Sequence, residues 1–101
     1  MQLFQILLPR SDNAGQPFPE QEFDRLKKQL ARQFDGVTAY LQAPAEGLWR
    51  QNGKSSGDDI VIFEVMTDTL DRKWWSAFRQ HLEEHFRQDT LIVRALDSTL
   101  L

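Results

Sequence analysis

The sequence predicts a single α+β domain, residues 1–101, in which strands and helices follow the order β-α-β-β-α-β. The length of 101 residues suits one domain. Two segments repeat apolar residues at helical spacing, and the segments around them are short, apolar and of strand length. Hydrophobic residues make up 41% of the chain and charged residues 27%, which is typical of a folded domain and not of a disordered one.

The first strand–helix pair is predicted at the N-terminus. Residues 3–8 are apolar apart from Gln5 and end at Pro9, and they have no basic leader before them, so we expect a strand there and not a signal peptide. A loop rich in turn-forming residues follows. Four residues then recur every three or four positions and predict an amphipathic helix from Glu20: Phe23, Leu26, Leu30 and Phe34. Gly36 is suited to the left-handed conformation that often follows a helix.

The middle of the chain predicts an extended hairpin. Its first strand is expected at residues 37–42, with a kink at 43–46 and renewed pairing at 48–50. Residues 52–57 are expected to form a mobile tip. Residues 60–67 are mostly β-branched or aromatic and predict the central strand of the sheet.

The last third of the chain predicts a second helix and a final strand. Residues 68–71 offer helix caps, and residues 90–96 form the strand. The expected inner stripe of the helix is Trp74, Phe78, Leu82 and either His85 or Phe86, with Trp75 at its shoulder. Two strand–helix–strand units joined by a hairpin predict the ferredoxin-like arrangement, a four-stranded antiparallel sheet with two helices on one face.

Strand alternation predicts what the uncovered sheet face contains. In the 60–67 strand, the residues expected to face the helices are Val61, Phe63 and Val65. The residues expected on the open face are Ile60, Ile62, Glu64 and Met66, with Thr38, Tyr40, Gln42, Ile92, Arg94 and Leu96 from the other strands. Exposed apolar patches normally mark interfaces or ligand grooves. We therefore expect a homodimer that packs sheet against sheet around a cavity.

Several segments carry a resemblance to a known group. They are residues 36–40 (GVTAY), 47–49 (GLW) and 58–65 (DDIVIFEV), and the pair Trp74-Trp75. Through them the chain resembles the dimeric α+β-barrel group of ferredoxin-like proteins, and more closely a set of uncharacterised bacterial proteins of about this length. The resemblance implies a shape and not a reaction, since the group includes cofactor-free monooxygenases, haem-degrading enzymes and regulatory ligand binders. None of their catalytic constellations matches residues of this chain.

Glu64 is the leading site candidate, because a carboxylate in the middle of a central strand is costly to bury without a partner. Arg94, Tyr40 and Gln5 are within reach if they share its face. One hypothesis is a polar cluster in the dimer cavity, with Glu64 and Tyr40 as candidate catalytic residues and Glu64, Tyr40 and Arg94 as ligand-binding residues. The alternative is an ion pair between Glu64 and Arg94 that fixes the dimer register, or two side chains that face solvent.

Trp49 and Arg50 are further binding candidates, near the end of the hairpin. Both residue types are common at interface hot spots. They are expected to cover the cavity or to anchor a partner subunit. Packing of Trp49 against its own sheet edge is the alternative.

Other chemistries find little support, and we expect no metal and no cofactor. His81 and His85 fit the H-x-x-E-H pattern of inverted zinc peptidases, but the chain ends too soon after them for the third ligand that such a site needs downstream. The net charge of −3 argues against a nucleic-acid partner, and no apolar run is long enough for a membrane span. The absence of cysteine fits a cytoplasmic location.

The function predicted from these features is a homodimeric small-molecule-binding or interaction module. Two alternatives stay open. One is a cofactor-free enzyme of the dimeric α+β-barrel type, similar to a monooxygenase, and the other is an interaction protein that binds a different chain.

Overall fold

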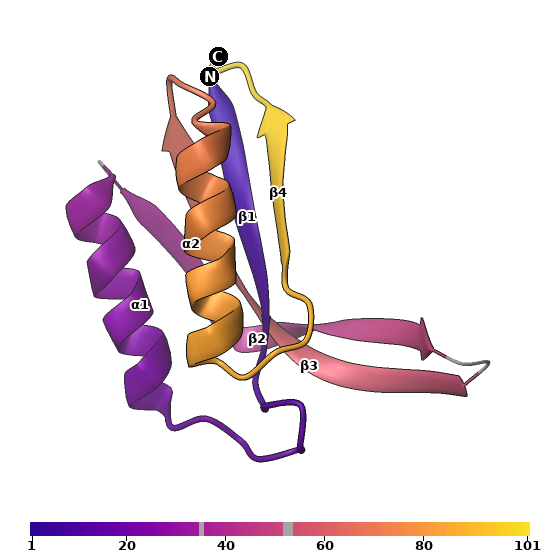
Figure 1. The fold of residues 1–101 in the computed structure, drawn as a ribbon. Helices are drawn as coiled ribbons and strands as arrows, with labels where there is room; N and C mark the ends of the chain where they lie inside the picture. Colours follow the sequence, from indigo (N-terminus) through magenta and orange to yellow (C-terminus); the bar gives the residue numbers. More distant parts are fainter. Residues whose placement is uncertain (35, 52–53) are drawn as a thin grey trace.

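The computed structural model describes the backbone of residues 1–34, 36–51 and 54–101, and the side chains of residues 1–34, 36–41 and 59–101. Figure 1 shows the order of elements that the sequence predicts. The elements are β1 (Gln2–Pro9), α1 (Glu20–Gln33), β2 (Val37–Gln51), β3 (Lys54–Thr67), α2 (Arg72–His85) and β4 (Ile92–Asp97).

The strands form one four-stranded sheet in the order β2-β3-β1-β4, and all neighbouring strands are antiparallel. Because β1 and β3 are central, each of the two strand–helix–strand units skips over one strand of the other. Both helices pack on the same side of this sheet (Figure 1). The fold is therefore the ferredoxin-like α+β sandwich, as predicted.

The core lies between the sheet and the two helices. The strand residues in it are Phe4, Ile6 and Leu8 of β1 and Val61, Phe63 and Val65 of β3. The helices contribute Phe23, Leu26, Leu30, Trp75, Phe78 and Leu82, and Phe86 and Leu91 follow α2. The strand alternation is the predicted one, so the residues between these positions in β1 and β3 face away from the helices.

The end of α1 differs from the prediction. Gly36 does not adopt a left-handed conformation; among the described glycines only Gly15 does, with φ of 84°. The helix ends instead at Phe34, whose backbone is extended and whose N–H binds the carbonyl of Leu30. The centroid of the Phe34 ring lies 5.4 Å from those of both Trp74 and Trp75, so aromatic packing holds the end of α1 against α2.

The two neighbouring tryptophans of α2 exchange their predicted positions. Trp75 is buried and stacks on Phe4, with ring centroids 4.1 Å apart, whereas Trp74 is only partly buried. The buried stripe continues to Phe86, not to His85, which is exposed. Asp71 caps the helix as predicted, accepting the N–H of Trp74 at 3.1 Å. In the part of the chain that the structure describes, no helix combines the length and apolar character needed to cross a membrane.

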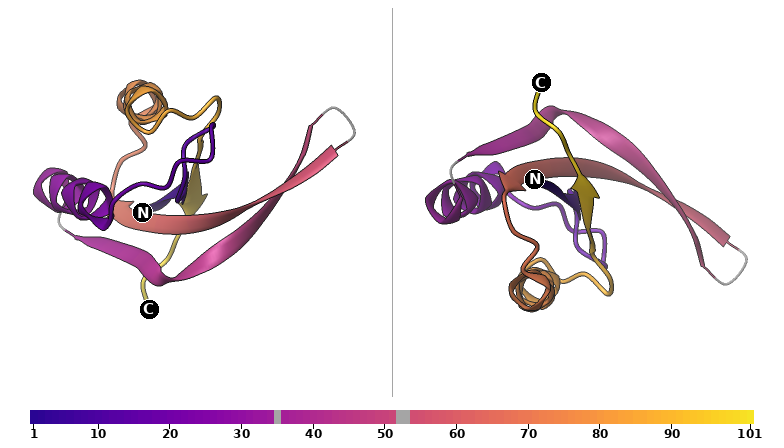
Figure 2. Two further views of the ribbon diagram at one scale, coloured as in Figure 1. Left: turned by 90° about the horizontal axis from the view of Figure 1, so that it is seen from below. Right: turned by 90° about the horizontal axis from the view of Figure 1, so that it is seen from above.

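The β2–β3 hairpin projects beyond the helices (Figure 2). Its register shifts between Tyr40 and Ala45, which confirms the predicted kink, and pairing resumes from Ala45–Ile60 to Gln51–Lys54. The predicted mobile tip is too long, because residues 54–57 pair with β2. Residues 52 and 53 lie outside the described part. Ile60, predicted on the open face, is buried at the kink.

Candidate functional site

On the face of the sheet away from the helices, polar and apolar side chains lie in separate rows. Its register aligns side chains into three rows across β4, β1 and β3. The first row is Leu96, Leu3 and Met66, the second is Arg94, Gln5 and Glu64, and the third is Ile92, Leu7 and Ile62. A polar row therefore lies between two apolar rows on a surface that the helices leave uncovered.

The polar row forms a hydrogen-bonded chain. Arg94 Nε donates to Gln5 Oε1 at 2.7 Å, and Gln5 Nε2 donates to Glu64 Oε2 at 3.3 Å. Hydrogen bonding with Glu64, followed by the negative charge of that carboxylate, raises the pKa of Tyr40 above its ordinary value. Every strand contributes one residue: β4 Arg94, β1 Gln5, β3 Glu64 and β2 Tyr40. We call these four residues the polar network.

Gln5 is the member that keeps the network together. Its carbonyl oxygen faces the Arg94 guanidinium and its amide NH₂ faces the Glu64 carboxylate, which is the orientation that both charged partners require. Glu64 and Arg94 do not form a direct ion pair within one chain, because Gln5 stands between them in the register. The sequence identified Gln5 as a residue within reach of Glu64, but not as a bridge.

The remaining candidates are placed only in part. Trp49 and Arg50 belong to β2, where they pair with Ser56 and Ser55, but their side chains lie outside the described residues. The side chain of Gln42 lies outside them too. The structure therefore brings together Glu64, Arg94 and Tyr40 from the predicted set, and adds Gln5.

The exposure of the polar network suits ligand contact. Tyr40 is 47% exposed, and Glu64 and Gln5 are half-buried. Arg94 retains guanidinium N–H donors beyond the one that binds Gln5, and the Glu64 carboxylate has further lone pairs. The row of Arg94, Gln5 and Glu64 offers a cation at one end and an anion at the other, and apolar rows flank it. Such a surface can orient a mostly apolar molecule through a few polar groups.

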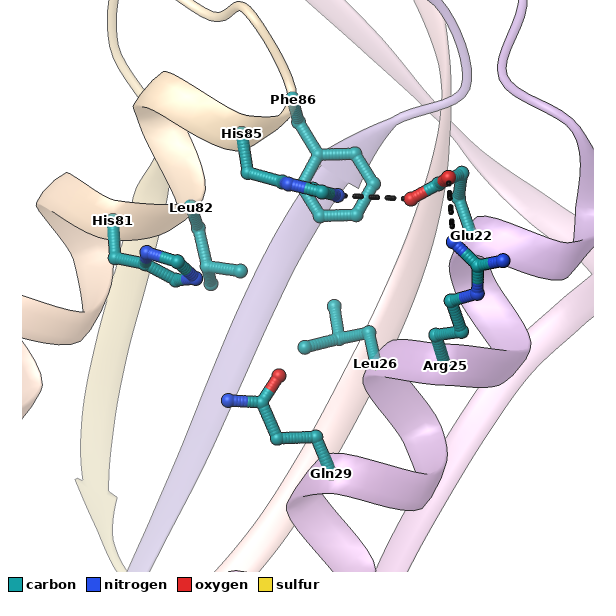
Figure 3. Close-up of a pocket in the computed structure, with 8 residues that line it drawn as sticks. All are labelled: Glu22, Arg25, Leu26, Gln29, His81, Leu82, His85 and Phe86. Carbon is teal, nitrogen blue, oxygen red and sulfur yellow. Dashed lines mark hydrogen bonds and ion pairs between the residues drawn. The ribbon is translucent and has the colours of Figure 1, made fainter.

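A pocket lies between the two helices (Figure 3). It has a volume of about 160 Å³ and is lined by Glu22, Arg25, Leu26 and Gln29 of α1 and by His81, Leu82, His85 and Phe86 of the α2 segment. His85 Nε2 lies 2.8 Å from Glu22 Oε2, and because an ionised carboxylate only accepts, the nitrogen carries the proton. This hydrogen bond is the main reason why the pKa of Glu22 is lowered, and partial burial opposes it.

The partner of His85 was missed at the level of sequence. The H-x-x-E-H pattern predicts a further metal ligand downstream of His85. The residue that contacts His85 is instead Glu22 on α1, 63 positions upstream. The sequence contains only an indirect indication that Glu22 lies near α2. Glu22 precedes the buried Phe23, so it lies at the edge of the α1 face that meets α2.

Comparison with known proteins shows the fold alone. No family model and no curated protein sequence matches the chain significantly. CutA1, a divalent cation tolerance protein from Thermus thermophilus, has a similar structure, with a TM-score of 0.67 and 14% identity over 99% of this chain and 86% of that chain. A CutA1 mutant from Pyrococcus horikoshii has a TM-score of 0.63 and 13% identity, over 100% of this chain and 86% of that chain. A phage SAM lyase in complex with S-methyl-5′-thioadenosine has a TM-score of 0.69 and 11% identity, over 95% of this chain and 80% of that chain.

Proposed function

We propose that the chain is a homodimeric small-molecule-binding module whose ligand lies between two open sheet faces. The observation that carries the proposal is the polar network, with one side chain from each strand, set between apolar rows. Burying a large apolar side chain contributes about 1.5–3 kcal/mol, so a partner that covers these rows is favoured. The cysteine-free sequence is compatible with a reducing compartment, and a bacterial cytoplasm is part of the proposal.

The charge pattern of the polar network supports a second copy of this chain as the partner. Across the sheet the charge changes from positive at Arg94 to neutral at Gln5 and negative at Glu64. A two-fold axis parallel to β1 that passes over Gln5 would bring Arg94 of one copy opposite the partner's Glu64, and the reverse. An axis perpendicular to the strands would place like charges opposite each other. Self-complementarity of the first kind is what a two-fold interface requires.

The chemistry of the face defines the class of ligand. Two apolar rows favour a compact, largely apolar body, and the polar network favours one or two hydrogen-bonding groups on it. The phage SAM lyase with the same fold was solved with S-methyl-5′-thioadenosine. That compound is therefore a reasonable first probe, beside whatever copurifies.

The first prediction concerns assembly. Native mass spectrometry of the protein purified gently from a bacterial host is expected to give a dimer that carries an additional non-covalent mass. Ile62→Asp adds a carboxylate to an apolar row and is expected to give monomers, because an unpaired charge is costly to bury. Leu70→Asp, at an exposed loop position, is the matched control and should remain dimeric.

A bare wild-type monomer would contradict the homodimer. A stable complex with a different chain from the native host would instead support the interaction-protein alternative. A dimer without any bound mass, which also fails to bind added probes, would contradict the ligand-binding part of the proposal.

An enzyme of the dimeric α+β-barrel type is the second candidate, favoured by the Tyr40–Glu64 hydrogen bond. A tyrosine hydroxyl is protonated at neutral pH at its ordinary pKa of about 10, and Glu64 raises the pKa of Tyr40 further. In this candidate Tyr40 therefore serves as a hydrogen-bond donor to the reacting molecule and Glu64 as the acid–base group.

The second prediction separates these two functions by the variant Glu64→Gln. For a binding module, we expect the fold to be unchanged and the affinity for the copurified ligand to change only a few-fold, since a glutamine amide keeps an acceptor for Tyr40. An acid–base enzyme would keep binding but lose about 10²–10⁴-fold in turnover. Ligand titration and turnover of the same ligand, measured on the same preparation, distinguish the two outcomes.

A further inference from the structure

The pocket between α1 and α2 gathers two imidazoles and a carboxylate from two different helices (Figure 3). His81 and His85 are four residues apart, so they lie on one face of α2. Their ring centroids are 6.2 Å apart and their ring planes differ by 22°. Glu22 reaches His85 from α1, with 2.8 Å between Oε2 and Nε2. Imidazole nitrogen and carboxylate oxygen are both ligands that Zn²⁺ takes in proteins.

We propose that this pocket binds one divalent transition-metal ion of the Zn²⁺ type through His81, His85 and Glu22. The ion would replace the proton that His85 and Glu22 now share. It would then link α1 to α2 by coordination, with solvent at the remaining position.

The metal-free side chains require a small rearrangement. As they stand, no three His, Asp or Glu side chains within the described part of the chain are placed to hold one ion. Two ligand atoms of a tetrahedral Zn²⁺ lie about 3.4 Å apart, given bonds of about 2.0–2.1 Å. The present separation of 2.8 Å between Glu22 and His85 therefore has to widen by only about half an ångström. His81 is exposed, so its ring can rotate toward the ion at the cost of a loose contact with Phe78, whose ring centroid lies 6.2 Å away.

The surroundings favour ligation from both helices. Leu26, Leu82 and Phe86 form an apolar floor, which limits competition by water. Arg25 Nη1 lies 3.4 Å from Glu22 Oε1 and leaves Oε2 directed at His85. The positive charge of Arg25 opposes a bound cation, but its side chain is exposed, so solvent screens this repulsion. This pocket lies in the helix layer, on the other side of the sheet from the polar network, so the metal proposal is independent of the proposed function.

The experiment is a calorimetric titration of the intact chain with Zn²⁺ alone, repeated on three variants. Wild type is expected to bind one equivalent. His81→Ala should abolish this binding. Glu22→Gln should weaken it by about tenfold or more, because loss of a direct ligand costs at least as much as loss of an outer-shell partner. Glu84→Gln removes an exposed carboxylate of the same helix that does not line the pocket, so it should bind as wild type does.

A second measurement reports whether the ion joins the helices. Zn²⁺ should raise the midpoint of thermal unfolding of wild type and Glu84→Gln, and should raise that of Glu22→Gln much less. Circular dichroism without metal checks that all variants fold alike. If Glu22→Gln binds Zn²⁺ as tightly as wild type, the histidine pair holds an adventitious ion only and the proposal fails. It also fails if wild type takes up less than one equivalent.

Discussion

Replacing Phe63 by alanine is expected to lower the free energy of unfolding by about 3–5 kcal/mol. Phe63 is 0% exposed and lies in the middle of β3, with Ile6 of β1 and Ala39 of β2 as its register neighbours. Truncation removes the ring from the contact between sheet and helices, and the surrounding side chains can close only part of the space. A domain of this length has a total stability of about 5–15 kcal/mol, so the loss is a large fraction of it.

The measurement for Phe63→Ala is urea unfolding, followed by tryptophan fluorescence and circular dichroism at one fixed protein concentration. Leu70→Ala is the control, because this leucine is 39% exposed in the loop before α2, and its loss should stay within about 0.5 kcal/mol. A loss below about 1 kcal/mol for Phe63→Ala would mean that the strand alternation is displaced by one residue.

The alternation of β3 was predictable because each side chain in a strand has only two faces to choose from. Once Phe63 is assigned to the core, Glu64 is assigned to the opposite face, where Arg94 and Tyr40 can meet it. The helical spacing of Phe23, Leu26 and Leu30 is an equally local signal, and the structure confirms it.

The predictions that failed concern residues whose positions depend on contacts with residues far away in the sequence. Trp74 and Trp75 both fit a helical stripe, and the choice depends on whether the stripe ends at His85 or Phe86. That choice is made by packing against the sheet, where Phe4 takes Trp75 as its neighbour. Tertiary contacts of this kind are not encoded in local propensity.

The two candidate sites show the same limit. Gln5 bridges Glu64 and Arg94, which are 59 and 89 positions away from it, so only the strand register reveals the bridge. The partner of His85 lies on another helix, which a search along the local motif could not reach. Residue types and faces could be predicted from the sequence, but the pairs that chemistry depends on required the register of β1 and the packing of α1 on α2.

The proposed dimer predicts a charge reversal that is rescued by a second reversal. Glu64→Arg is expected to weaken the dimer by about 10²-fold or more, because it sets two cations against each other across the interface and like charges there cost several kcal/mol. Adding Arg94→Glu to the same chain restores opposite charges at both contacts. The double variant should therefore recover most of the affinity, although each single variant loses it.

Sedimentation velocity over a range of protein concentrations measures the dimer constants of wild type, both single variants and the double variant. Glu64→Gln serves as the neutral control and should fall between wild type and Glu64→Arg. Circular dichroism and thermal unfolding separate a lost interface from a lost fold.

Within one chain Gln5 lies between the two charged residues, so intrachain repulsion is the smaller effect. Rescue requires Glu64 to face the partner's Arg94, since an axis perpendicular to the strands would place each reversed charge against its own copy. A double variant as weak as the single ones would therefore exclude the proposed packing, even if the wild-type protein is a dimer.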